Sequence, residues 1–172
     1  MKKFIILLLV FYIAIITLMP KENLYYTLKN RLKAERIIIA EDKLDDTFIA
    51  LNADGVALFY DGIESVNADD FSVMALGIYN KIDARNVGAS QDLKKMFGFS
   101  ADEVEITYAV WNYNEVVISA FGDFGTIDGT FELSSQTLKL LLDPSLAFEK
   151  SPLIRQYFKK SEEGYIYESK IK

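Results

Sequence analysis

Apolar positions along the chain follow three patterns, and each pattern predicts a different kind of element. Residues 4–19 form an unbroken apolar run that is preceded by two lysines and ends at Pro20. Residues 21–36 carry leucines and aromatic residues three or four positions apart, with basic residues between them, which predicts a helix. From residue 37, short segments rich in β-branched and aromatic residues predict strands joined by turns. We therefore expect an anchor at 1–20, a juxtamembrane helix at 21–36 and an exported β-rich domain at 37–172.

The apolar run and its positive head are typical of a segment that the secretion machinery reads. The run has 16 residues, slightly fewer than the roughly 17–25 of a membrane-spanning helix. A cleaved signal peptide needs small residues before the cut, and Leu18, Met19 and Pro20 do not supply them. We therefore favour an uncleaved signal anchor over a cleaved signal, with residues 4–19 as a single-pass span of a bacterial inner membrane.

Basic residues lie on both sides of the apolar run. Lys2 and Lys3 favour a cytoplasmic N-terminus, whereas the basic residues of segment 21–36 favour the reverse. The tail before the run is too short to form an exported domain. We therefore expect the N-terminus in the cytoplasm and the C-terminal domain in the periplasm.

The helix at 21–36 has two interpretations. It could lie on the bilayer surface as an amphipathic helix, or it could cover the end of a sheet. Its apolar stripe, built around Leu24, Leu28 and Leu32, is narrow, which favours packing on the sheet.

The domain at 37–172 is predicted to be α+β, mainly an antiparallel sheet, curled or sandwich-like, with short helices at its ends. Asp54-Gly55 predicts a hairpin between two short strands, and Asp61-Gly62 predicts a further turn. Ser90 and Ser151-Pro152 predict the starts of two short helices. The predicted strands are 36–40, 47–51, 56–60, 63–66, 71–79, 81–87, 104–111, 115–121, 125–133, 138–142 and 164–168.

Composition excludes large classes of function. The chain has 25 acidic and 19 basic residues, a net charge of −6, which argues against nucleic acid as a partner. It has no cysteine, so no disulfide forms, and no histidine, so a Ser-His-Asp triad and a His-ligated zinc site are impossible. We expect a protein that is not an enzyme and that has no cofactor or metal.

Several motifs have a plain structural interpretation. Asp123-Phe124-Gly125 matches the magnesium motif of kinases by letters alone, and we expect a turn there. The acidic groups within 42–46, at 69–70 and at 102–103 lack the spacing of a calcium loop, so we expect solvated turns. Trp111, the only tryptophan, could belong to a binding surface, but a lone tryptophan on a strand favours a place in the core.

Two regions carry a resemblance to a known family. Residues 20–28, directly after the apolar run, contain a proline, an acidic residue and a leucine-spaced helix. Residues 125–133 carry glycines four positions apart on a strand, and residues 142–145, 151–153 and 162–167 suggest a closing strand–helix–strand. These segments resemble the N-type inner-membrane subunits of bacterial type II secretion systems and, more distantly, AsmA-like envelope proteins. The resemblance implies an envelope-assembly component with a sheet open at one edge or curled into a trough.

Two functions are therefore expected. The first is a structural subunit of a secretion, pilus or DNA-uptake machine, which docks other envelope-complex subunits through its sheet edges. Its candidate contact residues are Trp111, Tyr113, Phe121 and Phe124. The second is a lipid carrier of the AsmA-like type, in which the concave side of the sheet is apolar. Its candidate concave residues are Phe59, Ile78, Ile118 and Phe131.

Overall fold

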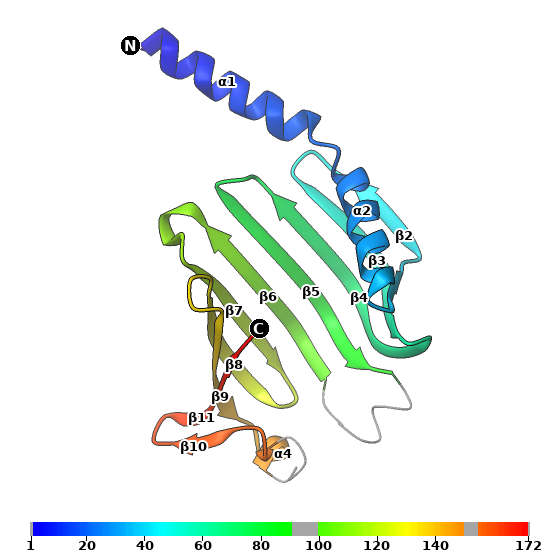
Figure 1. Ribbon diagram of the computed structural model, residues 1–172, viewed down its shortest axis with the longest axis vertical. Helices are drawn as coiled ribbons and strands as arrows, with labels where there is room; N and C mark the ends of the chain where they lie inside the picture. Colours follow the sequence, from blue (N-terminus) through cyan, green and yellow to red (C-terminus); the bar gives the residue numbers. More distant parts are fainter. Residues whose placement is uncertain (1, 91–99, 150–154, 172) are drawn as a thin grey trace.

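The computed structural model describes residues 2–90, 100–149 and 155–171 (Figure 1). Two helices, α1 (Lys2–Leu18) and α2 (Lys21–Ala34), precede a β-rich body. A short 3-10 helix, η1 (Val110–Asn112), and a short helix, α4 (Leu146–Glu149), interrupt the strands. The strands are β1 (Ile37–Ala40), β2 (Lys43–Asp46), β3 (Ala50–Tyr60), β4 (Ile63–Ala75), β5 (Tyr79–Ala89), β6 (Ser100–Ala109), β7 (Glu115–Gly122), β8 (Gly125–Glu132), β9 (Thr137–Pro144), β10 (Lys159–Ser161) and β11 (Gly164–Lys170).

The strands form one antiparallel sheet in the order β1-β3-β4-β5-β6-β7-β8-β9-β11-β10, with β2 also paired to β3. The sheet is not closed, because its two ends do not pair. In Figure 1, strands β3 to β6 are seen face-on and strands β7 to β9 nearly edge-on, so the sheet curls. The prediction of a mainly antiparallel β fold with a few helices is confirmed, and the strands form a single open sheet that curls.

One face of the sheet is mainly apolar and the other is mainly polar. Residues paired across neighbouring strands point to the same side, so each row of paired residues belongs to one face. Ala84, Val104, Ala120, Ile127 and Leu142 lie opposite one another across β5 to β9. The next row, on the other face, contains Asp83, Glu105, Ser119, Asp128 and Leu141. We call the first face the inner face and the second the outer face.

Helix α2 covers the inner face at one end of the sheet, beside β1 and β3 (Figure 1). Two ion pairs hold it: Lys21 Nζ lies 2.8 Å from Asp46 Oδ1, and Lys29 pairs with Glu41. This arrangement agrees with the prediction that the helix at 21–36 packs on the sheet.

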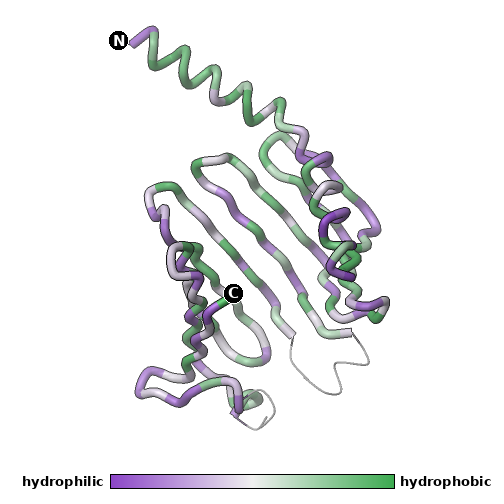
Figure 2. The backbone as a smooth tube through the Cα atoms, viewed as in Figure 1, coloured by the Kyte–Doolittle hydropathy of each residue, from purple (hydrophilic) through white to green (hydrophobic). Residues whose placement is uncertain are grey.

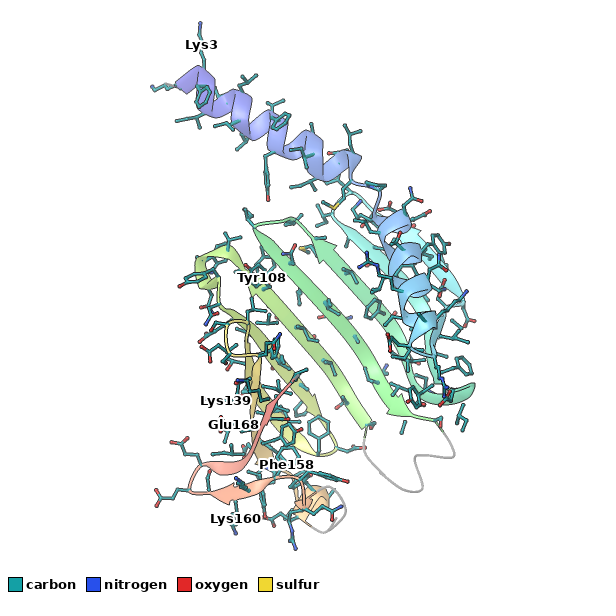
Figure 3. All side chains as sticks on the ribbon, viewed as in Figure 1. Lys3, Tyr108, Lys139, Phe158, Lys160 and Glu168 are labelled. Atoms are coloured by element: carbon teal, nitrogen blue, oxygen red, sulfur yellow. The ribbon has the colours of Figure 1, made fainter. Side chains whose placement is uncertain are left out.

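A small aromatic cluster covers the inner face at the other end of the sheet. Leu142 and Phe148 are the largest fully buried side chains among the described residues, and Tyr165 is buried beside them. The Phe148 ring packs edge-on against Tyr165, at 5.3 Å between centroids, and against Phe158, at 5.7 Å. Figure 3 shows Phe158 beside the C-terminal strands. The inner face is thus covered at its two ends and open between them.

Helix α1 extends away from the body and is apolar along most of its length (Figure 2). Its large aliphatic and phenylalanine side chains are exposed except for Ile16, which is buried, and Tyr12 is half-buried. Figure 3 shows Lys3 at its free end. Among the described residues, no single helix has both the length and the apolar character of a membrane span. Taken together, α1 and α2 are long and apolar enough for a membrane span by length and composition alone, but they are bent by 52° relative to each other.

The predicted hairpin at Asp54-Gly55 is wrong. A single strand, β3, runs through this dipeptide, and Gly55 has a φ of 61° within it. The reason is β2, a polar strand that the sequence analysis did not predict: its Lys43 faces Asp54 across the ladder. The dipeptide therefore causes an irregularity in a continuous strand instead of reversing the chain.

Other boundaries also differ from the prediction. The segment predicted as one strand at 71–79 is divided, because β4 ends at Ala75 and β5 begins at Tyr79. The acidic groups expected in turns lie mostly on strands, with Asp45 and Asp46 on β2, residues 69–70 on β4 and residues 102–103 on β6. Helix α4 and strand β10 were not predicted. The helix predicted after Ser90 lies outside the described residues, as does the first part, residues 151–154, of the helix predicted from Ser151.

Candidate functional site: an apolar groove between α2 and the sheet

An apolar groove of about 300 Å³ lies between α2 and the inner face of β3, β4 and β5. A second hollow of about 150 Å³ continues it toward the start of α2, with Tyr25 and Leu28 lining both. The combined volume falls at the lower end of the roughly 300–1,000 Å³ typical of ligand sites. The groove is lined by Tyr25, Leu28, Ile39, Val56, Leu58, Val66, Asn67, Ala68, Phe71, Val73, Ile82, Ala84 and Val87.

The groove depends on a local break in strand alternation. Ala53 faces Phe71, which lines the groove, so strict alternation would turn Val56, three positions further on, to the other face of the sheet. Gly55 has a positive φ, which breaks the alternation, and Val56 and Leu58 line the groove as well. On β5, Asn86 has a φ of 50°, and Val87 lines the groove together with Ala84. The irregularities let apolar side chains on both sides of the break face α2.

A polar bridge fixes α2 over the groove. Tyr25 donates a hydrogen bond from its hydroxyl to Glu41 Oε2 at 3.2 Å, and Lys29 Nζ donates one to Glu41 Oε1 at 2.7 Å. Burial, followed by the neighbouring charge of Glu41, raises the pKa of the Tyr25 hydroxyl well above its ordinary value. The Tyr25 hydroxyl therefore stays protonated and keeps donating, while its ring forms part of the groove wall.

The groove is not filled by the protein's own side chains. Leu28 lines it and is 50% exposed, and Ile82 and Val66 are 36% and 38% exposed. Side chains of this kind gain about 25 cal/mol for each Å² of apolar surface removed from water. An apolar ligand that covers the exposed wall would therefore gain the free energy that protein side chains gain when they are buried in a core.

The outer face carries a charged network instead. Lys81 Nζ lies 2.8 Å from Glu105 Oε2 and 3.1 Å from Asp83 Oδ2, and Arg85 also pairs with Asp83. Hydrogen bonds to Glu105 and then to Asp83 raise the pKa of Lys81 above its ordinary value. Asp83, Glu103 and Glu105 have carboxylate oxygens close enough to share a cation, but Lys81 and Arg85 already pair with this group.

The predicted contact residues are not brought together. Trp111 and Tyr113 lie in the β6–β7 connection, 71% and 77% exposed, so the prediction that Trp111 belongs to the core is wrong. Phe121 is exposed near the end of β7, and Phe124 lies in the β7–β8 turn, packed against the Leu142 cluster. Asp123-Phe124-Gly125 does form a turn followed by the start of a strand, as predicted.

Two of the four residues predicted on the concave side lie on the inner face. Ile118 faces Ile106, and Phe131 faces Val116 and Leu138, in rows shared with other inner residues. Ile78 instead lies exposed in the β4–β5 turn. Phe59 faces Ile38, one position beyond the groove residue Leu58, so it lies on the outer face.

The groove was not predicted from the sequence. Two features of the sequence point to it. Val66 and Ala68 are two positions apart on one strand and share a face, and Ala68 and Ala84 are small enough to leave space below α2. Comparisons with protein-family models, with curated proteins and with solved structures give no match.

Proposed function

We propose that this chain is a membrane-anchored lipid-binding protein whose curled sheet holds an acyl chain on its inner face. In this proposal, residues 4–19 anchor it in the bacterial inner membrane, the N-terminus is cytoplasmic and the β-rich domain is periplasmic. The observation that carries the proposal is the open apolar groove below α2, which continues into an inner face that is uncovered as far as the Leu142 cluster.

The chemistry of the groove supports a hydrocarbon chain as the ligand. Asn67 is its only amide side chain, the Tyr25 hydroxyl is engaged by Glu41, and its other lining residues are apolar. Each methylene group moved from water into such a groove contributes about 0.8 kcal/mol. A carbohydrate or nucleotide would leave its polar groups without partners against this wall.

The anchor supports the same proposal. Helix α1 presents large apolar side chains on all sides, with Ile16 as its only buried residue. A helix without a polar face is stable in lipid and is unfavourable in water. An anchor of this kind would keep the open part of the inner face close to a supply of lipid.

The proposal is tested by the lipid that accompanies the full-length protein out of native membranes. We expect native mass spectrometry in mild detergent to detect bound phospholipid or lipopolysaccharide, and the variant Ala84→Phe to bind it about tenfold more weakly. Excluding two methylene groups weakens binding by about 1.6 kcal/mol, or roughly tenfold.

The matched control is Val117→Phe, which adds a ring at an exposed outer-face position. We expect this variant to retain wild-type lipid occupancy, with both variants folded by circular dichroism. Equal occupancy in the Ala84→Phe variant, or wild-type protein that carries no lipid, contradicts the proposal.

A further inference from the structure

We propose that one end of the sheet rests in the interfacial layer of a lipid bilayer, beside α1. We call this end the rim. It consists of the four turns at 47–49, 76–78, 110–114 and 133–136, because every second turn of an antiparallel sheet lies at the same end. The inference rests on the membrane insertion of α1 proposed above, and it does not depend on acyl-chain binding.

The rim is apolar and free of charge. Charged residues make up 26% of the chain, yet none occurs in the four turns. The turns instead expose large apolar or aromatic side chains, namely Phe48, Ile78, Val110, Trp111, Tyr113 and Leu133. Loop tips that face water are normally polar, so a row of this kind marks a surface that contacts an apolar phase.

The opposite end of the sheet has a different chemistry. Its three fully described turns between strands, at 61–62, 123–124 and 162–163, all begin with an acidic residue. Trp111 and Tyr113 have apolar rings with one polar group each, which is the side-chain type enriched where a bilayer meets water. The asymmetry between the two ends indicates which end faces the membrane.

Three of the four turns of the rim contact one another. The Val110 amide donates a hydrogen bond to the Ile78 carbonyl at 3.0 Å, and the Trp111 ring stacks on Tyr79 at 6.2 Å between centroids. The Leu133 amide donates to the Asn114 carbonyl at 2.8 Å. These contacts join three of the four turns to one another.

The rim is also joined to α1. Tyr12 donates a hydrogen bond of 2.6 Å from its hydroxyl to the Leu76 carbonyl in the β4–β5 turn. Helix α1 has 17 residues and is therefore about 25 Å long, which is shorter than the roughly 30 Å hydrocarbon core of a bilayer. Tyr12 lies six residues before the end of α1, so the contact holds the β4–β5 turn within about 9 Å of that end along the helix axis. This leaves no linker that would hold the rim away from the lipid.

Trp111 is the only tryptophan, so its fluorescence reports directly on the rim. We would insert the full-length protein into zwitterionic phosphatidylcholine vesicles and compare quenching by brominated acyl chains with quenching by aqueous acrylamide. Bilayer contact predicts a blue-shifted emission, quenching by the brominated lipid and protection from acrylamide. A red emission that acrylamide quenches and the brominated lipid does not overturns the proposal.

Two variants in a Trp111→Phe background separate the possible failures. Phe11→Trp reports on α1, and Phe121→Trp reports on the end of the sheet opposite the rim. Bromolipid quenching of Trp at position 11 but not of native Trp111 contradicts the rim while leaving the anchor intact. Quenching at neither position contradicts the anchor itself, and quenching at position 121 contradicts the specificity of the rim.

Discussion

Lys29 of α2 donates a hydrogen bond of 2.7 Å to Oε1 of Glu41, which lies in the connection between β1 and β2. The two side chains are only 16% and 12% exposed, so water screens this ion pair weakly. The pair fixes the helix that forms one wall of the apolar groove, and it therefore links the stability of the protein to the shape of its candidate site.

Glu41→Gln is expected to destabilise the protein by about 2 kcal/mol, because it removes the charge that both Lys29 and Tyr25 face. For a chain of this size such a change lowers the thermal midpoint by roughly 4–8 °C. The measurement is thermal unfolding followed by circular dichroism. Glu162→Gln, at an exposed position, is the control, and equal midpoints for the two variants argue against a structural role of the ion pair.

Gly125→Ala is expected to be more damaging than Gly62→Ala. Both glycines have positive φ, 114° and 81°, so each substitution strains the backbone by about 1–2 kcal/mol. An added Cβ at position 62 meets nothing within 4 Å, whereas at position 125 it meets the Asp143 carbonyl oxygen at 2.1 Å. The backbone of β9 must then move, for a total cost of about 3 kcal/mol. Chemical denaturation of both variants tests this order, and similar costs contradict the close approach of β8 and β9.

Glu132 is expected to titrate below its ordinary range. Hydrogen bonds from Ser135, then Ser134, and from Asn114 lower the pKa of this carboxyl group. A lowered pKa in the folded state means that the stabilisation is present above the ordinary pKa and is lost as the pH falls through the folded-state pKa. NMR titration should show the low pKa, and Ser135→Ala should raise it. An unchanged pKa in that variant contradicts the assigned cause.

The fold was largely predictable because antiparallel strands alternate clearly where one face is apolar. Gly125 to Glu132 and Glu115 to Gly122 were predicted to within a residue or two, since each strand is regular and ends at a turn. The Asp54-Gly55 dipeptide was misread for a physical reason. It has the local preferences of a hairpin turn, but pairing of β3 with both β2 and β4 keeps the strand extended through it.

The site was less predictable than the fold. Trp111 was expected in the core because its large ring usually favours burial, but it lies in the connection between β6 and β7 and is 71% exposed. The groove depends on the positive φ of Asn86 and on the position of α2 over the sheet. Neither feature produces a periodic pattern of apolar residues in the sequence. The expected role as a subunit of an envelope machine stays a prediction, which co-purification of stoichiometric protein partners would test.

The most direct test of lipid binding places a photo-crosslinker on each face of one strand. Ile106 and Thr107 are neighbours on β6, both half-buried, with Ile106 on the inner face and Thr107 on the outer face. Each would be replaced by p-benzoylphenylalanine in the full-length protein, in cells grown with radiolabelled acyl chains. Acyl-chain binding predicts a labelled lipid adduct from position 106 and none from position 107. Equal labelling at the two positions, or no adduct from position 106 in folded protein, would contradict it.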